Sequence, residues 1–342
     1  MNEEKERDPY PPLDTPPKPI GDRETAERWL SEITGQPVDK VKKRLSREGH
    51  DLGITVREEL QAWKIEPYEW TDRLIEFYKQ SPAFMYETFV YNSLESKRAF
   101  RRRIVDYIGA SSRPSQTQEV LLYGDALGLD SAFLARCGYR TSYYELGKLS
   151  LQFASRVFEL NRVNVNIYER AGSLPQEAFD VVICLDVLEH VPDPPSLVRE
   201  LAGYLRLGGR LIIHAPFWYI HPAVQTHLRS NLTYSGDLRR LYLSAGLRPI
   251  DAGMLWYPIV LMKDPSAKPV SMAARMRILT SGWLMKLSRI LPGPLVIVSR
   301  LLFAPKADKR YWSGHDAHEL EIGVATLQPR CFVSVAMSRD CS

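Results

Sequence analysis

Histidine side chains follow several short apolar runs in the middle of the sequence. His190 comes after the run FDVVICL, His214 ends the run RLIIH, and His221 and His227 belong to the segment IHPAVQTHLR that follows. An imidazole can take a proton from a hydroxyl group near neutral pH, which is the work of a general base. Each of these histidines alone is more often a hydrogen-bonded structural residue, but we expect His227 first and His190 second to act as bases.

A glycine turn precedes this region of the chain. In VLLYGDALGLDS, residues 120–131, Gly124 and Gly128 stand between an apolar strand and a helical pattern, where backbone N–H groups can face a ligand. Dinucleotide-binding enzymes need G-x-G-x-x-G at such a turn, but Ala126 replaces the middle glycine, which disfavours a nicotinamide oxidoreductase. Glu145 ends the next strand 21 residues after Gly124, the separation at which an acid accepts hydrogen bonds from a ribose diol.

The elements that position these residues alternate between strand and helix. Short apolar runs at 119–124, 140–145, 164–169, 179–187 and 210–216 are separated by helical patterns. Such alternation predicts an α/β fold with a doubly wound, mostly parallel sheet that binds its ligand at the carboxyl edge of the strands.

Three regions of the 342 residues differ in composition and in hydrophobic pattern. Residues 1–21 are polar and proline-rich, which predicts a disordered lead-in. Residues 22–112 show helical periodicity and predict a helical N-terminal cap. Residues 113–342 carry the sheet, with a helical insertion at about 264–330 before an expected last strand in CFVSVAMS.

Two stretches bear a resemblance to a known family. FDVVICLDVLEHVPDPPSLVRELAGYLRLGGRLIIHAP resembles the fourth strand, helix and fifth strand of class I S-adenosylmethionine-dependent methyltransferases, and HLRSNLTYSGDLRRLYLSAGL resembles the segment that follows. The resemblance spans about residues 120–246. It implies a seven-stranded Rossmann-like sheet, S-adenosyl-L-methionine as cofactor, and a methyltransferase activity. His227 matches the position of a histidine common in related small-molecule enzymes.

The resemblance also implies which residues hold the cofactor. The glycine turn would hold the methionine end, the acid after the second strand the ribose, the residues after the third strand the adenine, and the end of the fourth strand the methionine portion. The corresponding residues are Tyr123, Gly124, Asp125, Ala126, Gly128, Glu145, Leu146, Ala171, Gly172, Ser173 and Asp186.

The glycine turn departs from the family pattern at two positions. Leu122 stands where the family has an acid, and Ala126 replaces the middle glycine. Asp125 could supply the missing negative charge to the cofactor's ammonium or sulfonium group. Alanine fits this turn provided that its backbone is not left-handed. We therefore expect an altered but functional loop; the alternative is a non-catalytic protein that binds the cofactor or a partner on a methyltransferase fold.

The acceptor expected from the sequence is a small molecule, a sugar or a lipid-linked glycan that is methylated on oxygen. The motif DPPS, residues 193–196, resembles a box of enzymes that methylate nucleic-acid bases, but it lies several residues after the strand and lacks the aromatic residue. Helix initiation explains it better, and a nucleic-acid partner is disfavoured. His315 and His318 have helical spacing but no third ligand nearby, so no metal site is predicted.

Composition points to a reducing compartment. The net charge is only +4, and four cysteines are scattered without paired spacing. The N-terminal sequence does not resemble a signal peptide, and no apolar run reaches membrane-spanning length, so a cytoplasmic location is expected. Residues 271–303 mix Met276 and Trp283 with basic residues, a pattern that predicts peripheral membrane contact, packing on the sheet or a dimer face.

Overall fold

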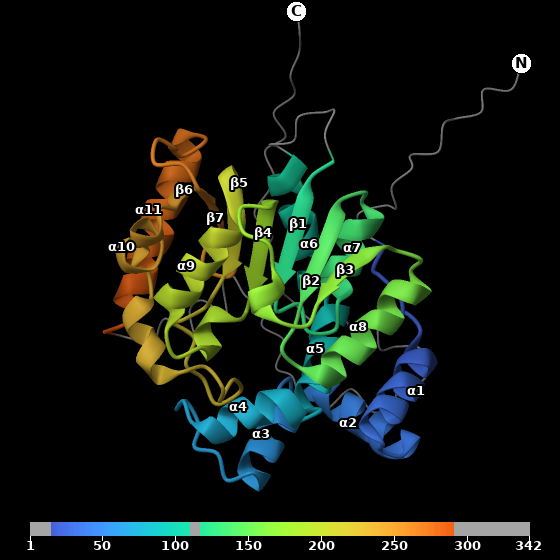
Figure 1. Cartoon of the computed structure of the whole chain (residues 1–342). Helices are drawn as coiled ribbons and strands as arrows, with labels where there is room; N and C mark the ends of the chain where they lie inside the picture. The colour runs from blue at the N-terminus through green and yellow to red at the C-terminus, as the bar shows by residue number, and fades with distance from the viewer. Residues whose placement is uncertain (1–14, 110–116, 291–342) are drawn as a thin grey trace, which may run out of the picture.

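A seven-stranded sheet forms the centre of the protein (Figure 1). The structure is a computed structural model that describes residues 15–109 and 117–290. The strand order is β3-β2-β1-β4-β5-β7-β6. All neighbouring strands are parallel except β7, which is antiparallel to both β5 and β6. This confirms the expected doubly wound, mostly parallel fold. The strands are β1 (Glu119–Tyr123), β2 (Arg140–Tyr144), β3 (Val165–Tyr168), β4 (Phe179–Leu185), β5 (Leu205–His214), β6 (Arg248–Ala252) and β7 (Ile259–Met262).

Helices connect the strands where the periodicity predicted them. They are α7 (Leu129–Arg136), α8 (Lys148–Leu160), α9 (Pro194–Tyr204) and the short α10 (Leu238–Leu241). The carboxylate of Asp193 accepts a hydrogen bond from the backbone N–H of Ser196 at 3.2 Å, and prolines occupy the first positions of α9. Residues 193–196 therefore initiate a helix, as expected.

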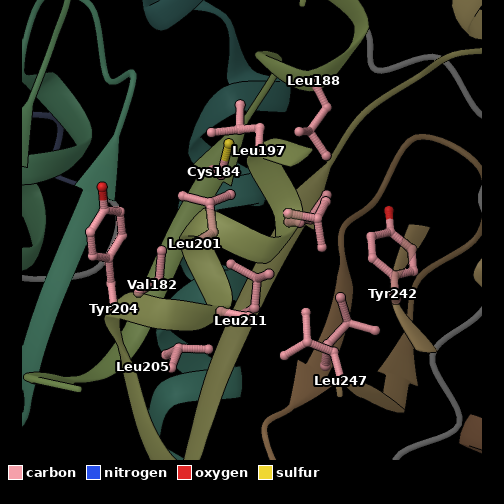
Figure 2. Close-up of a cluster of buried hydrophobic side chains, with 14 of the residues drawn as sticks. Val182, Cys184, Leu188, Leu197, Leu201, Tyr204, Leu205, Leu211, Tyr242 and Leu247 are labelled. Atoms are coloured by element: carbon pink, nitrogen blue, oxygen red, sulfur yellow. The ribbon is translucent and has the colours of Figure 1, made fainter. Parts of the chain in front are cut away.

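The core on one face of the sheet lies between α9 and the central strands. Figure 2 shows Leu197 and Leu201 of α9 beside Val182 and Cys184 of β4 and Leu211 of β5, and all five side chains are buried. Burying one such leucine contributes about 1.5–3 kcal/mol. The core therefore fixes β4, whose carboxyl end carries site residues.

Six helices precede the sheet in the described part of the chain. They are α1 (Arg23–Thr34), α2 (Val38–His50), α3 (Ile54–Ala62), α4 (Asp72–Gln80), α5 (Ala83–Ser93) and α6 (Glu95–Gly109). The helices α2 to α5 lie at one end of the sheet, below it in Figure 1. They share a buried cluster with the sheet domain, in which Met85 and Phe89 of α5 join Leu127 of the glycine turn and Phe153 of α8. The cap is thus packed directly on the cofactor loop.

Two parts of the N-terminal region differ from the sequence expectation. Ile20 is buried in the cluster of the cap, so the expected disordered lead-in does not extend over this residue; residues 1–14 lie outside the described part of the chain. Phe100, Ile104 and Ile108 of α6 pack on Val120 of β1. Their spacing of four residues gives α6 an apolar face, so α6 covers the sheet rather than belonging to the cap alone.

The end of the sheet domain contains one strand that the sequence analysis did not predict. Among the described residues, the sheet strands lie between Glu119 and Met262, and the helix α11 (Met272–Leu287) follows β7 in the chain. The expected position of this helix before a last strand stays a prediction. We missed β6 because Pro249 interrupts its pattern, and a proline is tolerated there because β6 is the edge strand. The expected strand at 331–338, like His315 and His318, lies outside the described residues.

Candidate active site

The candidate site lies where the carboxyl ends of β1, β2 and β4 meet. β1 lies between β2 and β4 and is parallel to both. The helix after β1 and the helix after β4 return to opposite sides of this point in the strand order, which makes it the topological switch point of the sheet. Ligands of such sheets bind in the crevice that opens there.

Gly124 brings the turn after β1 close to the end of β4. Its φ of +78° lies in the left-handed region, and a Cβ atom at this position would stand 2.6 Å from Cγ2 of Val187. A side chain would therefore be strained and would collide with the segment after β4. Only glycine fits the approach of these two segments.

Ala126 adopts a left-handed backbone conformation, contrary to the expectation from the sequence. Its φ is +43°, within the left-handed region, which costs a non-glycine residue about 1–2 kcal/mol. Its backbone N–H donates to Oε2 of Glu145 at 2.9 Å, and its carbonyl accepts from the Tyr143 hydroxyl at 2.5 Å. The two bonds hold the strained residue in place, so the loop keeps the shape that glycine would give it.

Asp125 points toward α7. Its Oδ2 accepts hydrogen bonds from the backbone N–H of Ser131 at 2.7 Å and from the Ser131 hydroxyl at 2.6 Å. Burial and the neighbouring Asp130 raise the pKa of Asp125 to about 7. This geometry gives Asp125 a structural part at the N-terminus of α7, and its role beside the cofactor's charged end stays a prediction.

The other expected cofactor residues lie around the same edge. Leu146, directly after Glu145, exposes 50% of its surface, and Gly172 and Ser173 are exposed in a short turn after β3. Tyr123, at the end of β1, packs its ring on Tyr144 at 4.7 Å between centroids. The remaining two, Ala171 and Gly128, lie in the turn after β3 and at the start of α7, respectively.

Asp186 follows β4 with a φ of +58°. Its carboxylate is hydrogen-bonded to Nδ1 of His214, at the end of the neighbouring strand β5. Burial disfavours the charged carboxylate, but the interaction with His214 prevails and lowers the pKa of Asp186 to about 2. Asp186 is therefore a fixed negative charge beside the switch point.

The two histidines expected to act as bases lie together. Their rings are 4.8 Å apart between centroids and nearly perpendicular. Nδ1 of His190 lies 3.1 Å from the carbonyl oxygen of Thr226, and Nδ1 of His227 lies 2.8 Å from that of Tyr219. A carbonyl only accepts, so each Nδ1 carries the hydrogen and each Nε2 keeps a free lone pair. Burial lowers the pKa of His190 to about 4 and that of His227 to about 3.

Sequence reasoning missed two residues beside these histidines. Glu189 is completely buried, and its Oε1 lies 3.9 Å from Nε2 of His227. The hydroxyl of Tyr78, from α4 of the cap, lies 3.1 Å from Nδ1 of His190. The helical spacing of Tyr78 predicts a residue of the core or of an acceptor pocket but not a contact with His190, and the motif LEHV draws attention to His190 rather than to Glu189. Glu189, His190 and His227 each offer an atom that a metal ion could bind.

A mainly apolar hollow opens beyond His214. The cavity is small, with a volume of about 50 Å³, and its walls are mainly apolar. Its lining includes Tyr234, Tyr242 and Tyr257, together with Met285 of α11. His214 also lines the hollow and connects it with Asp186.

A methyltransferase-domain family model matches residues 123–213, from the glycine turn to β5. This part of the chain is a methyltransferase domain. Strand order and the placement of the loop agree with this assignment, and the cofactor of such a domain is S-adenosylmethionine.

Known proteins similar to this chain cover only part of it. The ubiquinone biosynthesis O-methyltransferase of Aeromonas salmonicida (strain A449) is 33% identical over 114 residues, which are 32% of this chain and 48% of that protein. The protein of the same name from Coxiella burnetii (strain Dugway 5J108-111) is 26% identical over 161 residues, 42% of this chain and 69% of that protein. The chain spans about half the length of the first curated relatives it matches.

One solved structure of similar fold is magnesium protoporphyrin IX methyltransferase from Synechocystis PCC 6803 with bound SAH. It is 18% identical to this chain, with a TM-score of 0.41, over 55% of this chain and 95% of that one.

The residues of the loop fit S-adenosylmethionine. The missing side chain of Gly124 lets the glycine turn approach Val187, after β4, at the switch point. Each oxygen of Glu145 accepts one backbone N–H, from Ala126 at 2.9 Å and from Gly147 at 2.8 Å. A carboxylate has about four acceptor positions, so these bonds leave capacity for a ribose hydroxyl. Leu146 offers an exposed apolar surface on which an adenine ring can pack.

Proposed function

We propose that this protein transfers the methyl group of S-adenosylmethionine to a hydroxyl oxygen of a small molecule. The observation that carries the proposal is the pair of neutral imidazoles, His190 and His227, whose Nδ1 atoms face backbone carbonyls and which follow β4 and β5 at the sheet edge that carries the glycine turn. In the reaction the acceptor oxygen forms a bond to the methyl carbon, and the C–S bond breaks with its electron pair moving to sulfur. The hydroxyl proton must leave the oxygen.

The imidazoles are weak bases in this position. The low pKa values of His190 and His227 keep both rings neutral at pH 7, but they also limit the driving force for taking a proton. An acceptor whose hydroxyl is itself acidic, such as a phenol, suits such a site better than an ordinary alcohol. The apolar hollow beside His214 also favours a ring over a sugar. The relatives named ubiquinone biosynthesis O-methyltransferase are in line with this preference.

The proposal is tested by cofactor binding and by methyl transfer on an acceptor panel. Calorimetry should detect S-adenosylhomocysteine binding, and labelled S-adenosylmethionine should transfer its methyl group to phenols more readily than to sugars or lipid-linked glycans. His227→Gln should lower turnover with little change in cofactor affinity. No binding at millimolar cofactor would refute the assignment, and equal rates on phenols and sugars would refute the acceptor preference.

The non-catalytic alternative has one observation in its favour. The strained Ala126 and the apolar Leu122 depart from the family pattern of the cofactor loop. Under this alternative the chain binds S-adenosylhomocysteine but releases no methyl group to any member of a broad panel. Both candidate functions therefore predict S-adenosylhomocysteine binding, but only the methyltransferase predicts turnover.

Contact with a membrane surface is a further part of the proposal. Met272, Met276, Leu279 and Trp283 form a stripe along α11 and expose between 54% and 69% of their surfaces. The exposed basic side chains of Arg275 and Lys286 lie next to the stripe by helical spacing, and α11 carries no acidic residue. Helices of this kind lie in the interface of anionic membranes.

The inner face of α11 packs on the protein, where Ala274, Ile278 and Ser281 are buried. In the described part of the chain, 15–109 and 117–290, no helix has both the length and the apolar character needed to span a membrane. Co-sedimentation with phosphatidylglycerol vesicles tests the contact, with Trp283→Ala expected to reduce it. Protein that remains entirely in the supernatant would refute it.

A further inference from the structure

Three potential metal ligands converge beside the cofactor loop. Glu189, His190 and His227 each contribute one ligand atom, and these atoms lie within 4.8 Å of one another. Two of the residues come from the turn after β4, and His227 comes from the segment after β5. The cluster is therefore assembled by the fold and not by a local sequence motif.

The nitrogen atoms of the cluster that are not bonded to backbone carbonyls are hydrogen-bond acceptors. The carbonyl oxygens of Thr226 and Tyr219 fix the hydrogens of both imidazoles on Nδ1. The nitrogen left for a ligand is Nε2 in each ring. Histidine ligands of metal ions usually donate their other N–H to a carbonyl or carboxylate in this manner, because that bond fixes the tautomer and the ring orientation.

Glu189 lacks a partner for both of its carboxyl oxygens among the described residues. The side chain is 0% exposed, and neither Oε1 nor Oε2 has a hydrogen bond there. A buried polar group without a partner costs about 1–3 kcal/mol, and native structures rarely leave one unsatisfied. A metal cation, which binds the lone pairs of oxygen and nitrogen atoms, would provide a partner for all three side chains at once.

We propose that Glu189, His190 and His227 bind one divalent transition-metal ion of the Zn²⁺ type. Two imidazoles and one carboxylate suit Zn²⁺, Fe²⁺ or Co²⁺ better than Mg²⁺ or Ca²⁺, which prefer oxygen ligands. Three protein ligands leave at least one coordination position open, as in catalytic rather than structural zinc sites.

The open position gives the ion a use in the reaction, a step that rests on the proposed methyl transfer. A hydroxyl oxygen bound to a divalent ion has a lowered pKa, so its proton can leave to solvent. The bound oxygen then forms its bond to the methyl carbon while the C–S electron pair moves to sulfur. With both Nε2 atoms bound to the ion, His190 and His227 would serve as ligands, and the ion would take over from an imidazole base the task of promoting loss of the proton.

The test is metal binding by the full-length chain after removal of adventitious ions with a chelator. Titration with Co²⁺ should give visible absorption bands of a nitrogen-ligated ion at one equivalent per chain, and calorimetry should show Zn²⁺ binding much tighter than Mg²⁺ binding. Glu189→Gln and His227→Gln should each weaken Zn²⁺ binding by at least about 10-fold, since loss of even an outer-shell partner costs 10–100-fold. The exposed His50 of α2 provides a matched control, and His50→Gln should bind as the unmodified chain does.

Several outcomes would overturn the inference. They are the absence of Co²⁺ bands at millimolar metal, a preference for Mg²⁺, and unchanged Zn²⁺ affinity in Glu189→Gln. Circular dichroism checks that each variant is folded. If a variant does not fold, the presence or absence of Co²⁺ absorption bands in the unmodified chain decides whether the metal site exists. S-adenosylhomocysteine binding without metal binding refutes this inference alone, whereas metal binding without cofactor binding refutes the proposed function alone.

Discussion

Glu87, on α5 of the cap, provides a sensitive test of how dry the site region is. Burial raises the pKa of Glu87 to about 8, and the nearby carboxylates of Glu48 and Asp186 act in the same direction while Arg57 opposes them. The ordinary value is 4.5. At pH 7 the folded chain therefore keeps a proton on Glu87 that the unfolded chain has lost.

This difference makes folding less favourable as the pH rises. Stability that Glu87 contributes below pH 4.5 is lost progressively up to the folded-state pKa of about 8. Each pH unit in this window corresponds to about 1.4 kcal/mol, so the loss between pH 5 and pH 7 is on the order of 2–3 kcal/mol. Glutamine does not titrate, and Glu87→Gln should gain this amount relative to the unmodified chain over the same interval.

The assay is urea unfolding followed by tryptophan fluorescence at several pH values between 5 and 8. Comparing the variant with the unmodified chain across pH removes any constant effect of the substitution. Glu58 serves as a control, because its hydrogen bond with Arg47 lowers the pKa of Glu58, so that Glu58→Gln should show no pH-dependent difference in this window. A flat difference for Glu87→Gln as well would refute the reasoning that this part of the site excludes water.

Three further predictions concern the cofactor loop. Gly124→Ala should destabilise the protein by about 1–2 kcal/mol or more and weaken S-adenosylhomocysteine binding at least about 10-fold. The reason is that the backbone of Gly124 is left-handed and that an added Cβ would meet Cγ2 of Val187 at 2.6 Å. An unchanged affinity in calorimetry would contradict this. Ala126→Gly should raise the free energy of unfolding by up to about 1 kcal/mol and keep cofactor affinity, because it releases the strain at φ +43°; a loss of stability in urea would count against the strain. Glu145→Ala should weaken binding of S-adenosylhomocysteine by about 10–100-fold but that of methionine far less, since charge-assisted hydrogen bonds to the ribose contribute about 1.5–3 kcal/mol; an equal loss for both ligands would remove Glu145 from the ribose site.

The sheet could be predicted from the sequence where each strand had a distinct pattern. β4 reads as a continuous apolar run because both of its faces are buried, and α8 and α9 show clear helical periodicity. β6 could not be predicted in this way. Its five residues include Pro249 and Asp251, and only the edge position in the sheet makes them acceptable.

The cofactor loop could be located but its conformation could not. Spacing placed Gly124 and Glu145 at neighbouring strand ends, and the structure brings Glu145 into contact with the loop. The left-handed φ of Ala126 was not predictable, because it depends on anchoring by Glu145 and Tyr143 from the next strand. Sequence propensity argues against this conformation, and tertiary hydrogen bonds overrule it.

The histidine cluster was only half visible in the sequence. His190 and His227 attract attention as residue types. Glu189, which directly precedes His190, has the appearance of an ordinary surface acid in the sequence. Its burial follows from the 3₁₀ turn Leu188–His190, which directs Glu189 inward beneath the loop that carries His227. No pattern of one or a few neighbouring residues encodes such a meeting of two segments.

The cap decides where that loop lies. The backbone N–H of Tyr68 donates to the carbonyl of Gln225 at 2.7 Å, and the N–H of Arg229 donates to the carbonyl of Tyr68 at 3.0 Å, so that both sides of His227 are tied to the segment before α4. At Gly53, before α3, a Cβ atom would lie 2.5 Å from the carbonyl oxygen of Ala223, a further close approach of cap and loop. Because His227 is held between these contacts, the N-terminal region fixes the histidine on which both the proposed methyl transfer and the proposed metal site depend.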